Sequence, residues 1–264
     1  LRTPADFTRV AREFCADEAA AGTRYAEVMF TAAAHGERVG DPESPLVAVL
    51  EGLAWGRAEY GVETRVLLDH SRRKSVARAA ETLRLAKKYA PAVAGIGLAG
   101  DESFPAAPFA GVCAAARDAG LHVVHHAGES AGPASIRESV TLGRAERIGH
   151  GIRILDDPAL LAWVRDRGIA LEVCPSSNVA LGLVPSLAAH PLPALRAAGL
   201  AVTVSTDIPN LTGRTLSTEL AAVRDTFGYT DADLAALNHT AIDASFAPEQ
   251  TKLRLHAETA GWLG

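Results

Sequence analysis

The chain has 264 residues, 48% hydrophobic and 22% charged, so it is long enough to bury a substantial core. Its net charge of -5, with scattered lysines and arginines, gives no basic stripe for a phosphate backbone and argues against a nucleic-acid partner. Three widely spaced cysteines argue against a disulfide framework and a cysteine zinc site and favour a reduced, cytoplasmic setting, while no apolar run approaches the roughly 20 residues of a membrane span.

Apolar runs rich in Val, Ile and Leu alternate with helical patterns along most of the chain. The first feature is a helical pattern over Pro4–Ala21, for which Thr3 and Asp6 offer capping side chains. Ser44 and Asp157, each followed by proline, predict the starts of two further helices. The strand candidates are Tyr25–Phe30, Val62–Asp69, Val93–Ala99, Leu121–His126, Arg147–His150, Ile169–Cys174 and Ala201–Asp207. The alternation is typical of βαβ units with a parallel sheet.

The end of the chain is mostly helical, with patterns over Leu216–Phe227, Asp231–Leu237 and Glu249–Trp262. Seven parallel strands would leave two open edges, whereas eight strands close into a barrel. The chain opens on a helix and without a methionine, so the absent strand is expected upstream of Leu1. We therefore expect an α/β fold of the (β/α)8 TIM-type barrel class, one domain over residues 1–264, with its first strand missing from this chain.

Three of the predicted strands end in side chains that bind metals or transfer protons. His126 and Glu129 follow the apolar run 121–124, His150 stands in the segment R-I-G-H-G, and Asp207 ends the segment S-T-D. The carboxyl ends of parallel strands lie on one face of a sheet or barrel, where such folds build their active sites. We expect these four residues to surround one site.

These motifs resemble those of the adenosine deaminase family of metal-dependent hydrolases. The segments His126–Glu129, Arg147–Gly151 and Ser205–Asp207 carry the resemblance, together with 98–102 (L-A-G-D-E) and 174–178 (C-P-S-S-N). Residues 213–220 also resemble a helix that follows the barrel in that family. The similarity covers the chain from about Leu1 to the C-terminus in the family's order, and several ordered motifs are far more specific than one.

The resemblance implies a role for each site residue. His126 and Asp207 would be zinc ligands, and Asp207 would also accept a proton from the attacking water. Glu129 would be the general acid that protonates the purine ring, and His150 would hold the water by hydrogen bonding. Gly100 would present its backbone amide to the purine, a task that suits a residue without a side chain.

The implied chemistry is zinc-dependent hydrolytic deamination of adenosine or a closely related 6-aminopurine nucleoside, with release of ammonia. Zinc lowers the pKa of a bound water to about 7 and so supplies a nucleophile at neutral pH. Attack on an amidine carbon also needs a proton on the adjacent ring nitrogen, which a positioned carboxylic acid can supply. The expected partner is therefore a small-molecule purine nucleoside, and neither nucleic acid nor a membrane.

Two departures from the family pattern keep other hypotheses open. The chain contains no H-x-H pair, which in the family supplies two zinc ligands from the first strand, and Ile208 stands where many members carry an acid. A deaminase of adenine or of a modified adenosine is one alternative. A catalytically inactive nucleoside-binding homologue is the other.

Two further features carry expectations of their own. Glu172 interrupts an apolar strand and faces inward, where it would either orient a site histidine or pair with an arginine or lysine. The segment Cys174–Asn178 is expected to be a loop in which Ser176 and Asn178 cap backbone groups, with no nucleophilic role for the thiol.

Overall fold

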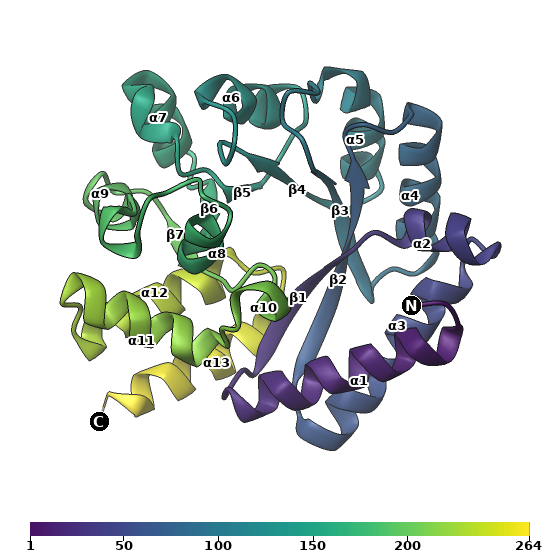
Figure 1. Ribbon diagram of the computed structural model, residues 1–264, viewed down its shortest axis with the longest axis horizontal. Coiled ribbons are helices and arrows are strands. Elements are labelled where there is room, and N and C mark those ends of the chain that lie inside the picture. Colours follow the sequence, from purple (N-terminus) through teal and green to yellow (C-terminus); the bar gives the residue numbers. More distant parts are fainter. Residues whose placement is uncertain (264) are drawn as a thin grey trace. The chain divides into compact units, whose positions relative to one another are not determined.

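The computed structural model describes residues 1–263 and consists of alternating strands and helices (Figure 1). The strands are β1 Tyr25–Phe30, β2 Glu63–Ser71, β3 Val93–Ala99, β4 His122–Ala127, β5 Arg147–His150, β6 Ala170–Val173 and β7 Val202–Val204. The helices before β5 are α1 Pro4–Ala20, α2 Ala32–Val39, α3 Ser44–Tyr60, α4 Val76–Lys88, α5 Ala110–Asp118 and α6 Pro133–Thr141. Those after β5 are α7 Pro158–Asp166, α8 Pro175–Ala180, α9 Leu192–Ala197, α10 Pro209–Thr212, α11 Leu216–Phe227, α12 Asp231–Ala244 and α13 Glu249–Trp262.

The seven strands form a sheet in which they follow one another in sequence order, from β1 to β7. The pairs β1/β2, β2/β3, β5/β6 and β6/β7 are parallel. The predicted α/β class with a parallel sheet is therefore confirmed. Within the described residues the order begins at β1 and ends at β7, and an eight-stranded closed barrel stays a prediction.

The chain divides into two compact units, each with its own apolar core. Unit 1 comprises Leu1–Val124 and Leu142–Arg144, and unit 2 comprises residues 125–141 together with those from 145 onward. The expectation of a single domain stays a prediction. In the part of the chain that the structure describes, no helix is long and apolar enough to cross a membrane.

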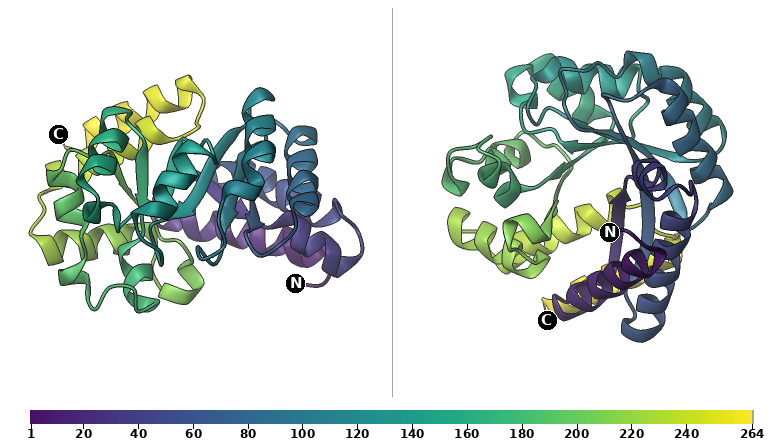
Figure 2. Two further views of the ribbon diagram at one scale, coloured as in Figure 1. Left: turned by 90° about the horizontal axis from the view of Figure 1, so that it is seen from above. Right: turned by 45° about the vertical axis from the view of Figure 1, so that its right-hand side comes forward.

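Unit 1 is built around the strands β1 to β3 and the helices that follow them. Helices α1 and α3 run side by side, as Figure 2 shows in purple and blue. The core contains fully buried side chains from both helices and from the sheet, including Phe7, Leu46 and Leu68. The loss of water contact by these apolar groups is the main source of stability for such a unit.

In unit 2 the two faces of β5 and β6 have different environments. Ile148 and Leu171 pack in the apolar core of this unit with side chains of α6, α7 and α9. Arg147 and Glu172 alternate with them and form an ion pair, with Arg147 Nε 2.7 Å from Glu172 Oε1. The Arg147 guanidinium also lies 3.7 Å from the ring centre of Phe246. Of the two roles considered for Glu172, the structure thus shows the pairing with an arginine.

Three helices begin where the sequence signals place them, and at two of these starts the expected side chain caps the helix. Thr3 and Asp6 form a reciprocal capping box on α1, and Asp157 accepts a hydrogen bond from the N–H of Leu160 at the start of α7. Helix α3 begins at Ser44 as expected, but the side chain of Ser44 does not cap it, because Ser44 is already helical and its N–H donates to Asp41 Oδ1. Asp41 therefore performs from outside the helix the task expected of Ser44.

Candidate active site

The loop after β4 brings Glu129 back toward the end of β5. The N–H of Gly151 donates to the carbonyl of Ala127, and the N–H of Arg153 donates to the carbonyl of Gly128. Gly128 has a φ of +68°, and a Cβ there would overlap the side chain of Ile136. Glycine is therefore required at the turn between His126 and Glu129, and the H-A-G-E motif has a local structural reason.

His150 and Asp207 have left-handed backbone conformations, with φ of 67° and 59°. Non-glycine residues adopt this region uncommonly, and each such residue costs of order 1 kcal/mol or more. Both residues stand where a strand ends, His150 as the last residue of β5 and Asp207 three residues after β7. The strained backbone therefore occurs at the two positions where the side chains turn toward the site.

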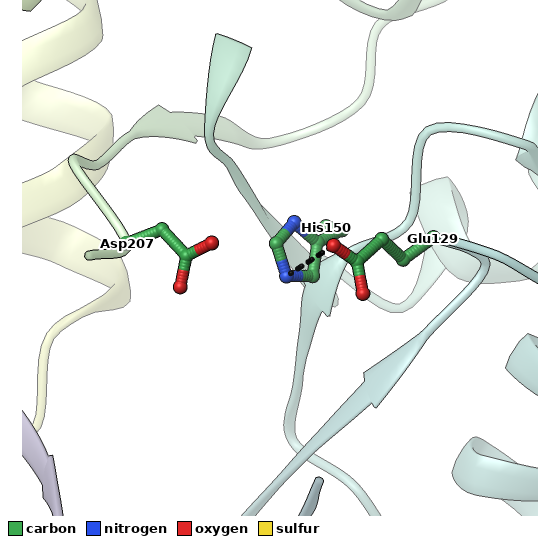
Figure 3. A group of neighbouring side chains, drawn as sticks. All are labelled: Glu129, His150 and Asp207. Atoms are coloured by element: carbon green, nitrogen blue, oxygen red, sulfur yellow. Dashed lines mark ion pairs between the residues drawn. The ribbon is translucent and has the colours of Figure 1, made fainter. Parts of the chain in front are cut away.

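Three side chains of unit 2 converge at these strand ends. Ligand atoms of Glu129, His150 and Asp207 all lie within 4.8 Å of one another, and Glu129 Oε1 is 3.5 Å from His150 Nε2. Figure 3 shows the imidazole between the two carboxylates, both of which point toward it. His150 is buried, Glu129 is half-buried and Asp207 is exposed, so the group opens to solvent on the side of Asp207.

The helix α8 holds two of these residues through hydrogen bonds. Ser177 Oγ donates to Asp207 Oδ2 at 2.5 Å, and Asn178 Nδ2 lies 3.3 Å from His150 Nδ1. Ser177 and Asn178 are both buried. The expectation of a loop that caps backbone groups was wrong here, since residues 175–180 are helical and these two side chains bind the site residues.

The other residues named from the motifs have different surroundings. The ring of His126 lies beside that of His150, with centres 5.3 Å apart, but His126 is outside the group of three. Gly100 belongs to unit 1, directly after β3, with a φ of +83°. Ile208 follows Asp207 and is 49% exposed.

Cys174 is buried at the start of α8. Burial raises the pKa of its thiol well above the usual range, and the negative charge of Asp207 raises it further. The thiolate is the reactive form of cysteine, so this environment disfavours the form that a nucleophilic role would need.

The family model described as adenosine deaminase matches residues 1–262. The chain belongs to the adenosine deaminase family. The resemblance drawn from the motifs is therefore confirmed, and the chain is a hydrolytic deaminase that acts on C–N bonds.

Known members of the adenosine deaminase family and related structures are similar to this chain over nearly its whole length. An adenine deaminase of Agrobacterium fabrum (strain C58) is 35% identical over 260 residues, which are 97% of this chain and 80% of that protein. The crystal structure of an adenine deaminase from Arthrobacter aurescens has a TM-score of 0.95 at 33% identity, covering 100% of this chain and 81% of that one. An amidohydrolase from Burkholderia ambifaria, solved with bound zinc, has a TM-score of 0.93 at 28% identity, covering 99% and 74%.

Proposed function

We propose that this chain catalyses the metal-dependent hydrolytic deamination of a 6-aminopurine, releasing ammonia and leaving a 6-oxopurine. The observation that carries the proposal is the convergence of Glu129, His150 and Asp207 in a member of the adenosine deaminase family. An acid, an imidazole and a second carboxylate within one small volume are the groups that addition of water to an amidine carbon requires.

The donor set supports a zinc ion at this place. Imidazole nitrogens and carboxylate oxygens are ligands that zinc accepts, and none of the three cysteines belongs to the converging group. We propose that Asp207 and His126 hold the metal and supply part of its ligand set. When bound, zinc would lower the pKa of a coordinated water to about 7.

The three converging residues divide the proton transfers among them. Asp207 accepts a proton from the attacking water, because its carboxylate is the group nearest solvent and one of its oxygens is already held by Ser177. His150 holds the water in place by a hydrogen bond. Glu129 donates a proton to the ring nitrogen beside C6, which makes that carbon electrophilic, and the water oxygen then bonds to C6. The proton that Asp207 took from the water passes to the amino group, the C6–N bond breaks and ammonia leaves, and the remaining hydroxyl proton returns to Glu129 as the 6-oxo group forms.

The names of the relatives favour adenine as the substrate, and the sequence motifs favour adenosine or a related nucleoside. Ile208 offers an apolar contact beside Asp207 and no hydrogen bond to a purine nitrogen. We place adenine first and adenosine second. Gly100 remains the proposed backbone contact to the purine.

The proposal is tested by ammonia release from adenine and adenosine with the intact protein loaded with zinc. In the Glu129→Gln variant we expect the zinc content to be retained and kcat to fall by roughly 10²- to 10⁴-fold, because the general acid is lost. In His126→Ala both zinc content and turnover should be lost.

Glu249→Gln serves as the matched control, since Glu249 is exposed at the start of α13. It should retain both zinc and activity. Full turnover in Glu129→Gln would remove this residue from the mechanism, and an intact zinc-loaded protein that deaminates neither substrate would refute the proposed function.

A further inference from the structure

A buried chain of hydrogen bonds reaches His150 from the side opposite Glu129. The backbone N–H of Leu192 donates to His190 Nδ1 at 3.1 Å, and His190 Nε2 lies 3.1 Å from Asn178 Oδ1. Asn178 Nδ2 lies 3.3 Å from His150 Nδ1, and His150 Nε2 faces Glu129. All of these residues lie in unit 2.

The direction of the first two hydrogen bonds follows from one unambiguous donor. A backbone N–H can only donate, so His190 Nδ1 must carry a lone pair and the proton of the neutral ring must be on Nε2. Burial lowers the pKa of His190 to about 4, so the ring is neutral at neutral pH. His190 Nε2–H therefore donates to Asn178 Oδ1. This bond fixes the amide of Asn178, because a rotated amide would place two donors against each other.

The amide of Asn178 in turn presents N–H to His150. We infer that Asn178 and His190 are positioning residues that hold neutral His150 in the tautomer with its proton on Nε2. An amide nitrogen has no lone pair to offer, so His150 Nδ1 must accept and Nε2 must carry the hydrogen. Asn178, His190 and His150 are 0%, 3% and 3% exposed, so water does not compete for these bonds.

The tautomer decides what His150 can do in the reaction. With a proton on Nε2, His150 is a donor toward Glu129 and toward the attacking water, and it has no lone pair there with which to remove a proton. The task of accepting the proton of the water then falls to Asp207. This assignment rests on the proposed function, whereas the tautomer itself follows from the hydrogen bonds alone.

The substitution Asn178→Asp tests the inference with almost no change of shape. A carboxylate only accepts, so His150 Nδ1 should become protonated, which ¹⁵N NMR of the imidazole nitrogens of the intact protein reports without zinc or substrate. With zinc and substrate, kcat should fall by roughly 10- to 100-fold, the usual effect of removing such a hydrogen-bond partner, while KM changes far less. Asn238→Asp, on α12, is the matched control and should leave both readouts unchanged.

A second pair of variants, at His190, distinguishes loss of the hydrogen bond from a general loss of folding. His190→Gln retains one acceptor and one donor and should keep the His150 proton on Nε2, whereas His190→Leu should let both tautomers appear. A proton on His150 Nδ1 in the unaltered protein, or an unchanged tautomer in Asn178→Asp, would overturn the inference. The NMR measurement needs no turnover. It therefore tests the tautomer even if the protein proves inactive and the proposed function fails.

Discussion

At the scale of single residues, the site depends on two backbone conformations that few side chains tolerate. His150 and Asp207 both have positive φ, although neither is a glycine. The strain costs free energy, and its persistence at both positions indicates that the surrounding hydrogen bonds determine them. For His150 those bonds come from Asn178, and for Asp207 they come from Ser177.

Ser177 provides a first test at this scale. The variant Ser177→Ala should weaken zinc binding by roughly 10- to 100-fold, because a carboxylate ligand loses the group that orients it. The measurement is competition for zinc between the intact protein and a chromogenic chelator. Ser176→Ala is the control in the same turn, since the contact of Ser176 is made by its backbone N–H to Glu219. Equal zinc affinity in the two variants would contradict the role given to Ser177.

The motifs in the sequence named Glu129, His150 and Asp207, and the structure brings these three together. The supporting residues Ser177, Asn178 and His190 could not be derived in the same way. Their partners lie 12 to 30 positions away along the chain, and the contacts depend on how α8 meets β5 and β7. One signal was present, namely a run of three polar residues, 176–178, shortly after an apolar strand.

At the scale of elements, the apolar runs predicted the existence of every strand. The bounds of β1, β3 and β5 were correct, whereas β7 is shorter than the expected 201–207 and ends at Val204. The N–H of Ser205 still donates to the carbonyl of Val173 on β6, and the chain then leaves the sheet and becomes left-handed at Asp207. Apolar periodicity does not report such turns, because it records burial and not φ.

The packing of α1 against α3 gives a prediction for an element. A Cβ at Gly52 would lie 2.6 Å from both Ala11 Cβ and the carbonyl oxygen of Thr8 on α1. Alanine normally stabilises a helix by about 1 kcal/mol relative to glycine. Here overpacking should outweigh that gain, and Gly52→Ala should lower the free energy of unfolding by about 1–3 kcal/mol, measured by urea denaturation.

Gly111 in α5 supplies the control for this prediction. It is exposed, its φ is negative, and nothing lies within 4 Å of a Cβ built there. Gly111→Ala should therefore leave the free energy of unfolding unchanged or raise it by up to about 1 kcal/mol. If Gly52→Ala were as stable as Gly111→Ala, the two helices would not be held at the close approach described.

At the scale of the whole molecule, the division into two units runs through a strand. Residues His122–Val124 of β4 belong to unit 1, and His125–Ala127 belong to unit 2. Loss of structure in either unit would therefore remove part of β4. Val124 and His125 are consecutive residues of β4, so no linker separates the two units at this point of the chain.

We therefore expect the intact protein to unfold in a single cooperative transition. The chain offers a reporter in each unit, because Trp55 lies on α3 and Trp163 on α7. Variants that keep only one of these tryptophans, with the others replaced by phenylalanine, should give coincident urea transitions by fluorescence, as two-state behaviour requires. Calorimetry of the unaltered protein should agree, with equal calorimetric and van't Hoff enthalpies. Circular dichroism of the same variants measures how far the replacements themselves shift the midpoint. If the fluorescence midpoints of the two variants differ by more than that shift, the units are independent domains.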